Sequence, residues 1–373
     1  MKDWPQSESV LAPLARWFDT YRRELPWRAR DLDVPHPAPW RVLVSELMLQ
    51  QTQAATVIPY FERWMARWPS PEAAAAADPD EIHKAWEGLG YYQRARHLQA
   101  AAQAITGQGW PKDLASLLAL PGLGPYAAAA VAAIAFQRPE PALDGNAFRV
   151  LARLLRIESD PRSHVAALRT WVRPALVALG PSRLTQALMD LGALICTRRP
   201  ACEACPLAPD CAARQAGLER VLPLPRPRRI LSASALWLLA IEAEGCWLLR
   251  EPASKGLLAG LWTWPSRERS ATSEDLAAEG PQAPGVHIIG VAAAPAWCQV
   301  YTHRREDIHP LVLHLSRRPP APAGLRWVLE GSLADLALGR RDQRMRALLG
   351  TAREALPPGT PLGPLLGGLF VEP

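Results

Sequence analysis

The chain has 373 residues, of which 49% are apolar and 21% are charged, and its net charge is +6 at neutral pH. This length exceeds the size at which a single hydrophobic core keeps growing, so two domains are expected. No apolar run is long enough to cross a bilayer and residues 1–10 lack a signal-peptide pattern, so we expect a cytoplasmic protein with no membrane partner. The basic excess suits a polyanionic partner but does not identify one.

The first 220 residues have the pattern of an all-helical domain. Apolar side chains recur at three- and four-residue spacing, as on one face of a helix, and no strand-like run interrupts them. The clearest of these helical stretches are 42–48, 114–120, 147–157 and 184–195.

The character of the sequence changes after this domain. Residues 221–230, VLPLPRPRRI, are rich in proline and arginine and lack periodicity, which predicts a stiff, extended linker. Residues 231–373 then form a second domain, whose short apolar runs broken by glycine and proline indicate an α+β fold. These strand-like runs are 234–241, 246–250, 286–293 and 311–315. Two isolated cysteines in this domain, Cys246 and Cys298, are expected to be ordinary core thiols.

Four of the six cysteines lie within sixteen residues of one another, spaced C-x5-C-x2-C-x5-C. They are Cys196, Cys202, Cys205 and Cys211. Thiolates on one short loop can converge on a metal centre without ligands from elsewhere. By spacing alone, zinc and an iron–sulfur cluster both stay open, as do unligated thiols.

A glycine-rich turn at 120–126, LPGLGPY, opens into an apolar helix at 127–136. In a helix–hairpin–helix turn, such glycines let backbone N–H groups approach a DNA phosphate, which positions the DNA without reading its bases. An ordinary glycine-rich helical hairpin has the same local pattern.

Two carboxylates of this domain are candidates for chemistry. Asp144, in ALDGN at 142–146, precedes a periodic helix, where an aspartate is most often a capping residue. Glu46 lies on an amphipathic helix, where a glutamate is usually solvated or paired. Neither position indicates catalysis by itself.

In this order, the turn, the aspartate and the cysteine cluster resemble the endonuclease III and MutY superfamily of DNA glycosylases. The resemblance implies a groove between two helical subdomains, flanked by the hairpin and the aspartate. It also implies that the four cysteines hold a [4Fe–4S] cluster. The first gap between the cysteines has five residues here, one fewer than is usual in the superfamily.

Two further strings, SELMLQQTQ at 45–53 and GLGYYQR at 88–94, resemble the MutY-type adenine glycosylases. The resemblance implies that Glu46 protonates adenine N7 and that Asp144 stabilises the cation that develops on the sugar. The adenine must first be flipped out of the duplex into a pocket.

The resemblance also implies which residues surround the flipped base and the DNA. The adenine-pocket residues are Arg23, Trp27, Arg28 and Gln186. The DNA-binding residues are Gln51, Tyr91, Gly122, Gly124 and Tyr126. Of these, Gln51 and Tyr91 would replace the stacking that is lost beside the damaged base. Lyase relatives carry a Schiff-base lysine where this chain has Tyr126, so a monofunctional glycosylase is expected. The connection at 29–39 is longer than is common in the family.

In the second domain, KGLLAGLWTWP at 255–265 resembles the Nudix-like C-terminal domain of MutY proteins. In the string Tyr301–His303, the resemblance implies that Thr302 and His303 recognise 8-oxoguanine. The acidic stretch 266–280 lacks the paired glutamates that a magnesium-dependent Nudix hydrolase needs, so a binding module is expected.

The sequence therefore predicts an all-α helix–hairpin–helix glycosylase domain at 1–220 with a [4Fe–4S] loop at 196–211, followed by an α+β Nudix-like domain. The predicted partner is double-stranded DNA with adenine opposite 8-oxoguanine or guanine, bound by a monomer in base excision repair. A pyrimidine glycosylase-lyase is disfavoured by Tyr126. An iron–sulfur protein that only binds DNA is disfavoured by the two carboxylates.

Overall fold

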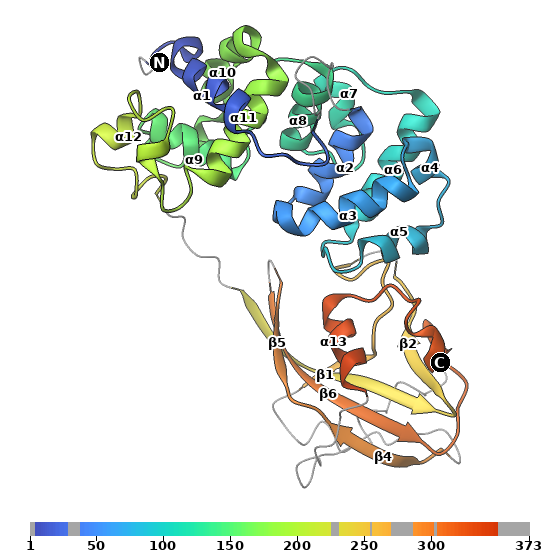
Figure 1. Cartoon of the computed structure of the whole chain (residues 1–373). Coiled ribbons are helices and arrows are strands. Elements are labelled where there is room, and N and C mark those ends of the chain that lie inside the picture. Colours follow the sequence, from blue (N-terminus) through green and yellow to red (C-terminus); the bar gives the residue numbers. More distant parts are fainter. Residues whose placement is uncertain are drawn as a thin grey trace. The chain divides into compact units, whose positions relative to one another are not determined.

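The computed structural model describes residues 4–28, 38–224, 231–253, 256–269, 286–301 and 304–349. By their contacts, the residues form two compact units (Figure 1). The first unit contains Met1–Asp78 and Arg94–Pro227, and the second contains Pro79–Gln93 and Arg228–Pro373. Residues 79–93 thus group with the second unit, although the sequence predicts a helical domain over 1–220 that includes them.

The first unit is helical, and its described residues contain no strand. Its helices are α1 (Ser7–Tyr21), α2 (Pro39–Leu49), α3 (Ala54–Arg67), α4 (Pro71–Ala75), α6 (Gln93–Gln108), α7 (Leu114–Leu118), α8 (Pro125–Phe136), α9 (Gly145–Leu154), α10 (Val165–Leu179), α11 (Pro181–Leu194) and α12 (Ala212–Gln215), with short 3-10 turns η1 (Pro161–His164) and η2 (Cys202–Ala204). All four predicted helical stretches are present, with ends that differ by a few residues. Within the described part of the chain, no helix is both long and apolar enough to span a membrane.

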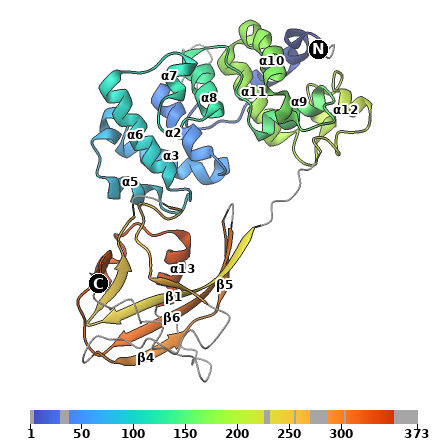
Figure 2. The ribbon, with the colours of Figure 1, turned by 180° about the vertical axis from the view of Figure 1, so that it is seen from behind.

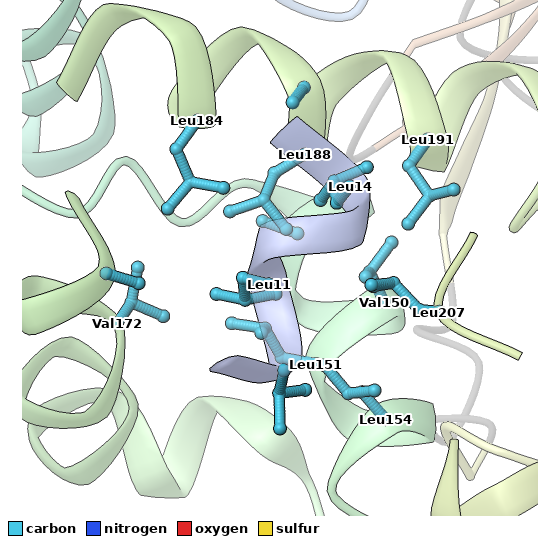
Figure 3. Close-up of a cluster of buried hydrophobic side chains, with 14 of the residues drawn as sticks. Leu11, Leu14, Val150, Leu151, Leu154, Val172, Leu184, Leu188, Leu191 and Leu207 are labelled. Carbon is cyan, nitrogen blue, oxygen red and sulfur yellow. The ribbon is translucent and has the colours of Figure 1, made fainter. Parts of the chain in front are cut away.

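One hydrophobic core joins α1, α9, α10 and α11 (Figure 3). Leu11 and Leu14 of α1 pack with leucines of α11 and with the apolar face of α9. The α11 leucines Leu184, Leu188 and Leu191 recur at three- and four-residue spacing, so they share one face of the helix. Truncating one such buried leucine to alanine typically costs about 2–5 kcal/mol of stability. This packing fixes α9 and α11, which both carry residues of the candidate site.

Helix α8 is apolar on every side and consists mostly of alanine. Residues 127–135 are all buried. Pro125 stands in the first turn, where its missing N–H costs no hydrogen bond and its fixed φ suits the helix. The helix packs against α2 and α11, and small side chains at such a contact allow the helix axes to approach closely.

The second unit contains α5 (Pro79–Trp86), a mixed sheet, the 3-10 turn η3 (Glu330–Ser332) and α13 (Arg340–Leu348) (Figure 2). Its strands are β1 (Ser232–Ala243), β2 (Cys246–Arg250), β3 (Ser266–Glu268), β4 (Ile288–Ala293), β5 (Trp297–Val300), β6 (Arg304–Leu315) and β7 (Leu325–Leu329). Across the described ranges the strand order is β4-β6-β1-β2-β7, with β3 paired to β1 and β5 to β6. Strands β1 and β6 run parallel, and the other pairs are antiparallel.

The two faces of this sheet bury separate cores, because alternate residues of a strand point to opposite sides. On β1, Leu238 joins the core that contains Met345 of α13, whereas its neighbour Leu239 joins the core on the other face. The prediction of a second domain with helix and strand together is confirmed at this level.

The prediction for the isolated cysteines is correct for one and wrong for the other. Cys246 on β2 is buried, and its sulfur accepts a hydrogen bond from Arg318 Nη1 at 3.0 Å. Cys298 on β5 is exposed, because this strand turns its neighbour Trp297 into the core and therefore turns Cys298 outwards.

Candidate active site

A cavity of about 1100 Å³ lies in the first unit, lined by residues of α2, α8, α9 and α11. The sequence-predicted residues that line it are Arg23, Trp27, Arg28, Glu46, Gln51, Gly124, Tyr126, Asp144 and Gln186. The cavity therefore brings together both predicted catalytic carboxylates and every predicted adenine-pocket residue.

The other predicted site residues lie elsewhere. Tyr91 belongs to the second unit, is 48% exposed, and follows two glycines of positive φ, Gly88 and Gly90. Gly122 does not line the cavity but lies in the hairpin turn of the first unit. Thr302 and His303 fall outside the described residues.

Glu46 is the buried acid of this cavity. It lies on α2 and is only 5% exposed. Burial raises the pKa of its carboxyl to about 7, and the charge of Asp144 acts in the same direction. A hydrogen bond from Tyr126 and the charge of Arg28 oppose this rise. Glu46 thus holds its proton near neutral pH, as a general acid must.

Asp144 stands at the N-cap of α9, where its Oδ1 accepts a hydrogen bond from the Ala147 N–H at 2.7 Å. Burial raises the pKa of this carboxyl above its usual range, although hydrogen bonds from the N–H groups of Ala147 and Asn146 favour the charged form and reduce the rise. Asp144 is therefore a helix cap and a cavity residue at once. The two interpretations left open by the sequence do not exclude each other.

Tyr126 connects the hairpin helix to the acid. It stands in the first turn of α8, and its hydroxyl hydrogen-bonds the Glu46 carboxyl. Burial, followed by the charges of Glu46 and Asp144, raises the pKa of Tyr126 well above its usual range, so the hydroxyl stays protonated and donates. The family resemblance predicts Tyr126 as a DNA contact and does not predict its contact with Glu46.

Asp190, on α11, is a second residue that the sequence analysis missed. Its fully buried carboxylate accepts from Arg23 Nε at 2.7 Å and from Arg28 Nη1 at 2.6 Å and Nη2 at 3.0 Å. Burial would raise the pKa of Asp190, but the two arginines outweigh it and lower this pKa. Asp190 anchors the segment that carries Arg23 and Arg28 along the cavity wall. Its only sequence signal is its place four residues after Gln186, on the same helix face.

The hairpin turn needs its glycine. Gly122 has a φ of +80°, which L side chains rarely adopt, and a Cβ there would lie 2.5 Å from the Cβ of His97. Gly124 is the N-cap of α8, so α8 begins at the cavity, as α9 does at Asp144. Both helix ends direct backbone N–H groups and positive partial charge to this part of the unit, as an anion-binding turn requires.

The four clustered cysteines form no disulfide and lie near the end of the first unit. Cys196 follows α11, Cys202 begins the turn η2, and Cys211 precedes α12. Arg153 Nη1 donates to the Cys196 sulfur at 3.3 Å. Arg149, which lines the cavity, donates to the Cys196 carbonyl at 2.7 Å. The thiol loop is thereby tied to α9.

Among the described residues, no three His, Cys, Asp or Glu side chains converge closely enough to hold one metal ion. Four thiols on one short loop are a donor set that suits a [4Fe–4S] cluster and also suits a zinc ion. The hydrogen bond from Arg153 to the Cys196 sulfur is of the kind that tunes cluster sulfurs.

Comparison with known proteins gives the family. Residues 44–174 match the family described as HhH-GPD superfamily base excision DNA repair protein. An adenine DNA glycosylase of Mus musculus is 30% identical over 95% of this chain and 82% of its own length. One of Mycolicibacterium smegmatis is 41% identical over 55% of this chain and 69% of its own. One of Arabidopsis thaliana is 33% identical over 70% of this chain and 48% of its own, so this chain spans about half the length of that relative. The chain belongs to the adenine DNA glycosylase family of the helix–hairpin–helix superfamily.

Proposed function

We propose that this chain is a monofunctional glycosylase that hydrolyses the N-glycosidic bond of adenine paired with 8-oxoguanine or guanine in double-stranded DNA. One observation carries the proposal: Glu46 and Asp144 face one cavity but differ in environment. Burial raises the pKa of both carboxyls, that of Glu46 to about 7, but at Asp144 hydrogen bonds from backbone N–H groups favour the charged form and oppose this rise. Glycosidic bond cleavage requires one protonated and one ionised carboxylate, and these N–H donors favour Asp144 as the ionised one.

In the proposed reaction, the adenine leaves the base stack and enters the cavity, which costs a few kcal/mol of stacking and pairing. Glu46 then donates its proton to N7 as the bond from N9 to the sugar carbon breaks. The negative charge of Asp144 stabilises the cation that develops on the sugar. A water molecule adds to that carbon and gives up a proton to the Glu46 carboxylate, which completes hydrolysis and restores the acid. Tyr126 holds Glu46 through its hydroxyl during this step.

Among the residues that the structure describes, no lysine lines the cavity, and this supports hydrolysis without strand cleavage. A lyase needs a lysine nucleophile, and Lys112 is the only lysine between residues 85 and 254. Its carbonyl accepts from Arg138 in the described structure, and it does not line the cavity. We therefore assign no covalent amine step to this chain.

We propose that the four clustered cysteines hold a [4Fe–4S] cluster. The ligands would be Cys196, Cys202, Cys205 and Cys211. Such a cluster would supply structural order to the loop, through ligated thiolates, at the end of the DNA-binding unit. Arg153 would donate to the Cys196 thiolate, and Arg149 would hold the loop to the cavity wall.

We assign the second unit the role of a Nudix-like binding module that examines the base opposite adenine through Thr302 and His303. Replacing both by alanine should narrow the preference for 8-oxoguanine over guanine about tenfold, since a specific base contact is worth about 1–3 kcal/mol. Paired titrations at one salt concentration test this role. Equal weakening on both duplexes would refute it.

The test of the catalytic proposal is incubation with a duplex that holds adenine opposite 8-oxoguanine, followed by alkali. Strand scission only after alkali is expected, because hydrolysis leaves an abasic site that alkali cleaves. The matched variant Glu46→Gln keeps shape but lacks the transferable proton, so it should bind the duplex and not excise. Scission without alkali would identify a lyase instead, and activity of the variant within about tenfold of wild type would remove Glu46 from its role.

A further inference from the structure

Arg94 is the last residue of the string GLGYYQR, and no step proposed above uses it. It stands near the start of α6 and is only 6% exposed. Its Nη1 donates to the carbonyls of Leu47 at 2.9 Å, Met48 at 2.8 Å and Gln50 at 2.6 Å. Its Nη2 donates to Thr52 Oγ1 at 3.3 Å. One guanidinium thus binds the whole turn that follows α2.

These contacts explain why a buried cation is tolerated there. The last carbonyls of a helix have no partner within the helix and carry negative partial charge. Arg94 satisfies two of them at the end of α2, the helix that carries Glu46. Its planar set of donors can reach several carbonyls at once, which a lysine ammonium on a flexible stem does less well.

The turn that Arg94 binds holds Gln51 in an unusual backbone conformation. Gln51 has a φ of +58°, in the left-handed region that non-glycine residues adopt at a cost. Arg94 binds the residue before it, Gln50, and the residue after it, Thr52. The Thr52 N–H also donates to the Leu49 carbonyl at 3.1 Å. Gln51 itself is exposed and lines the cavity.

We infer that Arg94 is a positioning residue that holds Gln51 at the exposed edge of the cavity, in the conformation in which it fills the space left by a flipped adenine. The inference rests on the proposed function, because it assigns Gln51 a role in base flipping. Because Arg94 holds the turn, Gln51 is already in place before DNA binds. The turn therefore does not have to be ordered when the base leaves the stack. Arg94 acts through Gln51 and touches no reacting atom.

A double-mutant cycle of Arg94→Met and Gln51→Ala tests the inference. The readouts are the single-turnover rate of adenine excision and the fluorescence of 2-aminopurine placed beside the adenine, which rises when its neighbour unstacks. Each single variant should lower the rate about tenfold to a hundredfold, because misplacement of a positioning group by about 1 Å has effects of that size. The double variant should be within about threefold of the slower single variant, because residues that act together are not additive.

Controls separate this role from general stability. Arg138→Met removes another arginine that donates to a backbone carbonyl of the same unit, that of Lys112, and should leave both readouts unchanged. Arg94→Lys keeps the charge and should recover part of the fluorescence rise; if Arg94→Met does not fold, the cycle is run with Arg94→Lys. The inference would be overturned if the two substitutions lowered the excision rate by independent factors that multiply in the double variant. A fluorescence rise equal to that of wild type in the Arg94 variant would also overturn it. If wild type itself excises no adenine, the proposed function fails instead.

Discussion

The Tyr126 hydroxyl donates a hydrogen bond to the Glu46 carboxyl, and this bond lowers a pKa that burial raises. Tyr126→Phe removes the bond, so the pKa of Glu46 should rise above about 7. Because the acid is active when protonated, the alkaline limb of the excision profile should move to higher pH. Single-turnover rates measured across pH in both proteins check this. A shift to lower pH would mean that the limb reports another group.

Glu46→Gln should change stability in a pH-dependent way. A carboxyl with a pKa of about 7 in the folded state and an ordinary value of 4.5 in the unfolded chain destabilises the fold as pH rises between these values. At pH 8 the variant should therefore be more stable than wild type by up to about 3 kcal/mol, and near pH 4 the difference should vanish. Urea denaturation at the two pH values measures it. A difference that does not depend on pH would contradict the raised pKa.

Asp144→Asn should separate capping from catalysis. The Ala147 N–H can donate to an asparagine oxygen as it does to Asp144 Oδ1, and asparagine is a good N-cap. The free energy of unfolding should thus change by less than about 1 kcal/mol, whereas excision should fall by at least about a hundredfold with loss of the negative charge. Thermal melts and single-turnover rates provide the two readouts. A stable variant with normal turnover would leave Asp144 as a cap alone.

Asp190→Asn should lower the free energy of unfolding, because it leaves two arginines beside a neutral side chain in a buried site. Breaking a buried ion pair from one side typically costs about 3–5 kcal/mol. The matched control is Asp19→Asn, whose pair with Arg183 is about one third exposed and should contribute about 1 kcal/mol or less. Because the folded-state pKa of Asp190 is lowered, its contribution should be lost as pH falls. Equal losses in the two variants would argue against the buried anchor.

Cys202→Ser should remove iron from the purified protein and weaken binding to duplex DNA, since the thiol loop would lose its ligated order. Iron and sulfide analysis is the direct check. Cys298→Ser, at the exposed isolated cysteine, should leave the iron content unchanged. One equivalent of zinc without iron would show that the shortened first gap holds a different metal.

Much of this site could be predicted from the sequence. Periodicity indicates the helices, and the resemblance to the MutY-type glycosylases indicates Glu46, Asp144 and Arg28, which the structure brings to one cavity. The hydrogen bond between Tyr126 and Glu46 could not be predicted from the residues alone, because it depends on how α8 packs against α2. Asp190 was missed for the same reason.

Two other differences between the sequence predictions and the structure, at Cys298 and at residues 79–93, have local causes. Cys298 lies in an apolar stretch, as a core cysteine would. Only the alternation of side chains along β5 decides that Trp297 rather than Cys298 faces the core. The apolar spacing at 79–86 indicates the helix α5, but it does not indicate the unit with which this helix groups.

The alanine helix α8 has a consequence for how this site can change. The helix packs against α2, and seven of its twelve residues are alanines, whose methyl groups have no rotamers to adjust, so the two backbones largely set the separation between Tyr126 and Glu46. A larger side chain on the face of α8 that packs against α2 would push the two helices apart and stretch the bond that tunes the acid. Substitutions along this contact can therefore adjust the working pH of the acid without altering Glu46 or Tyr126.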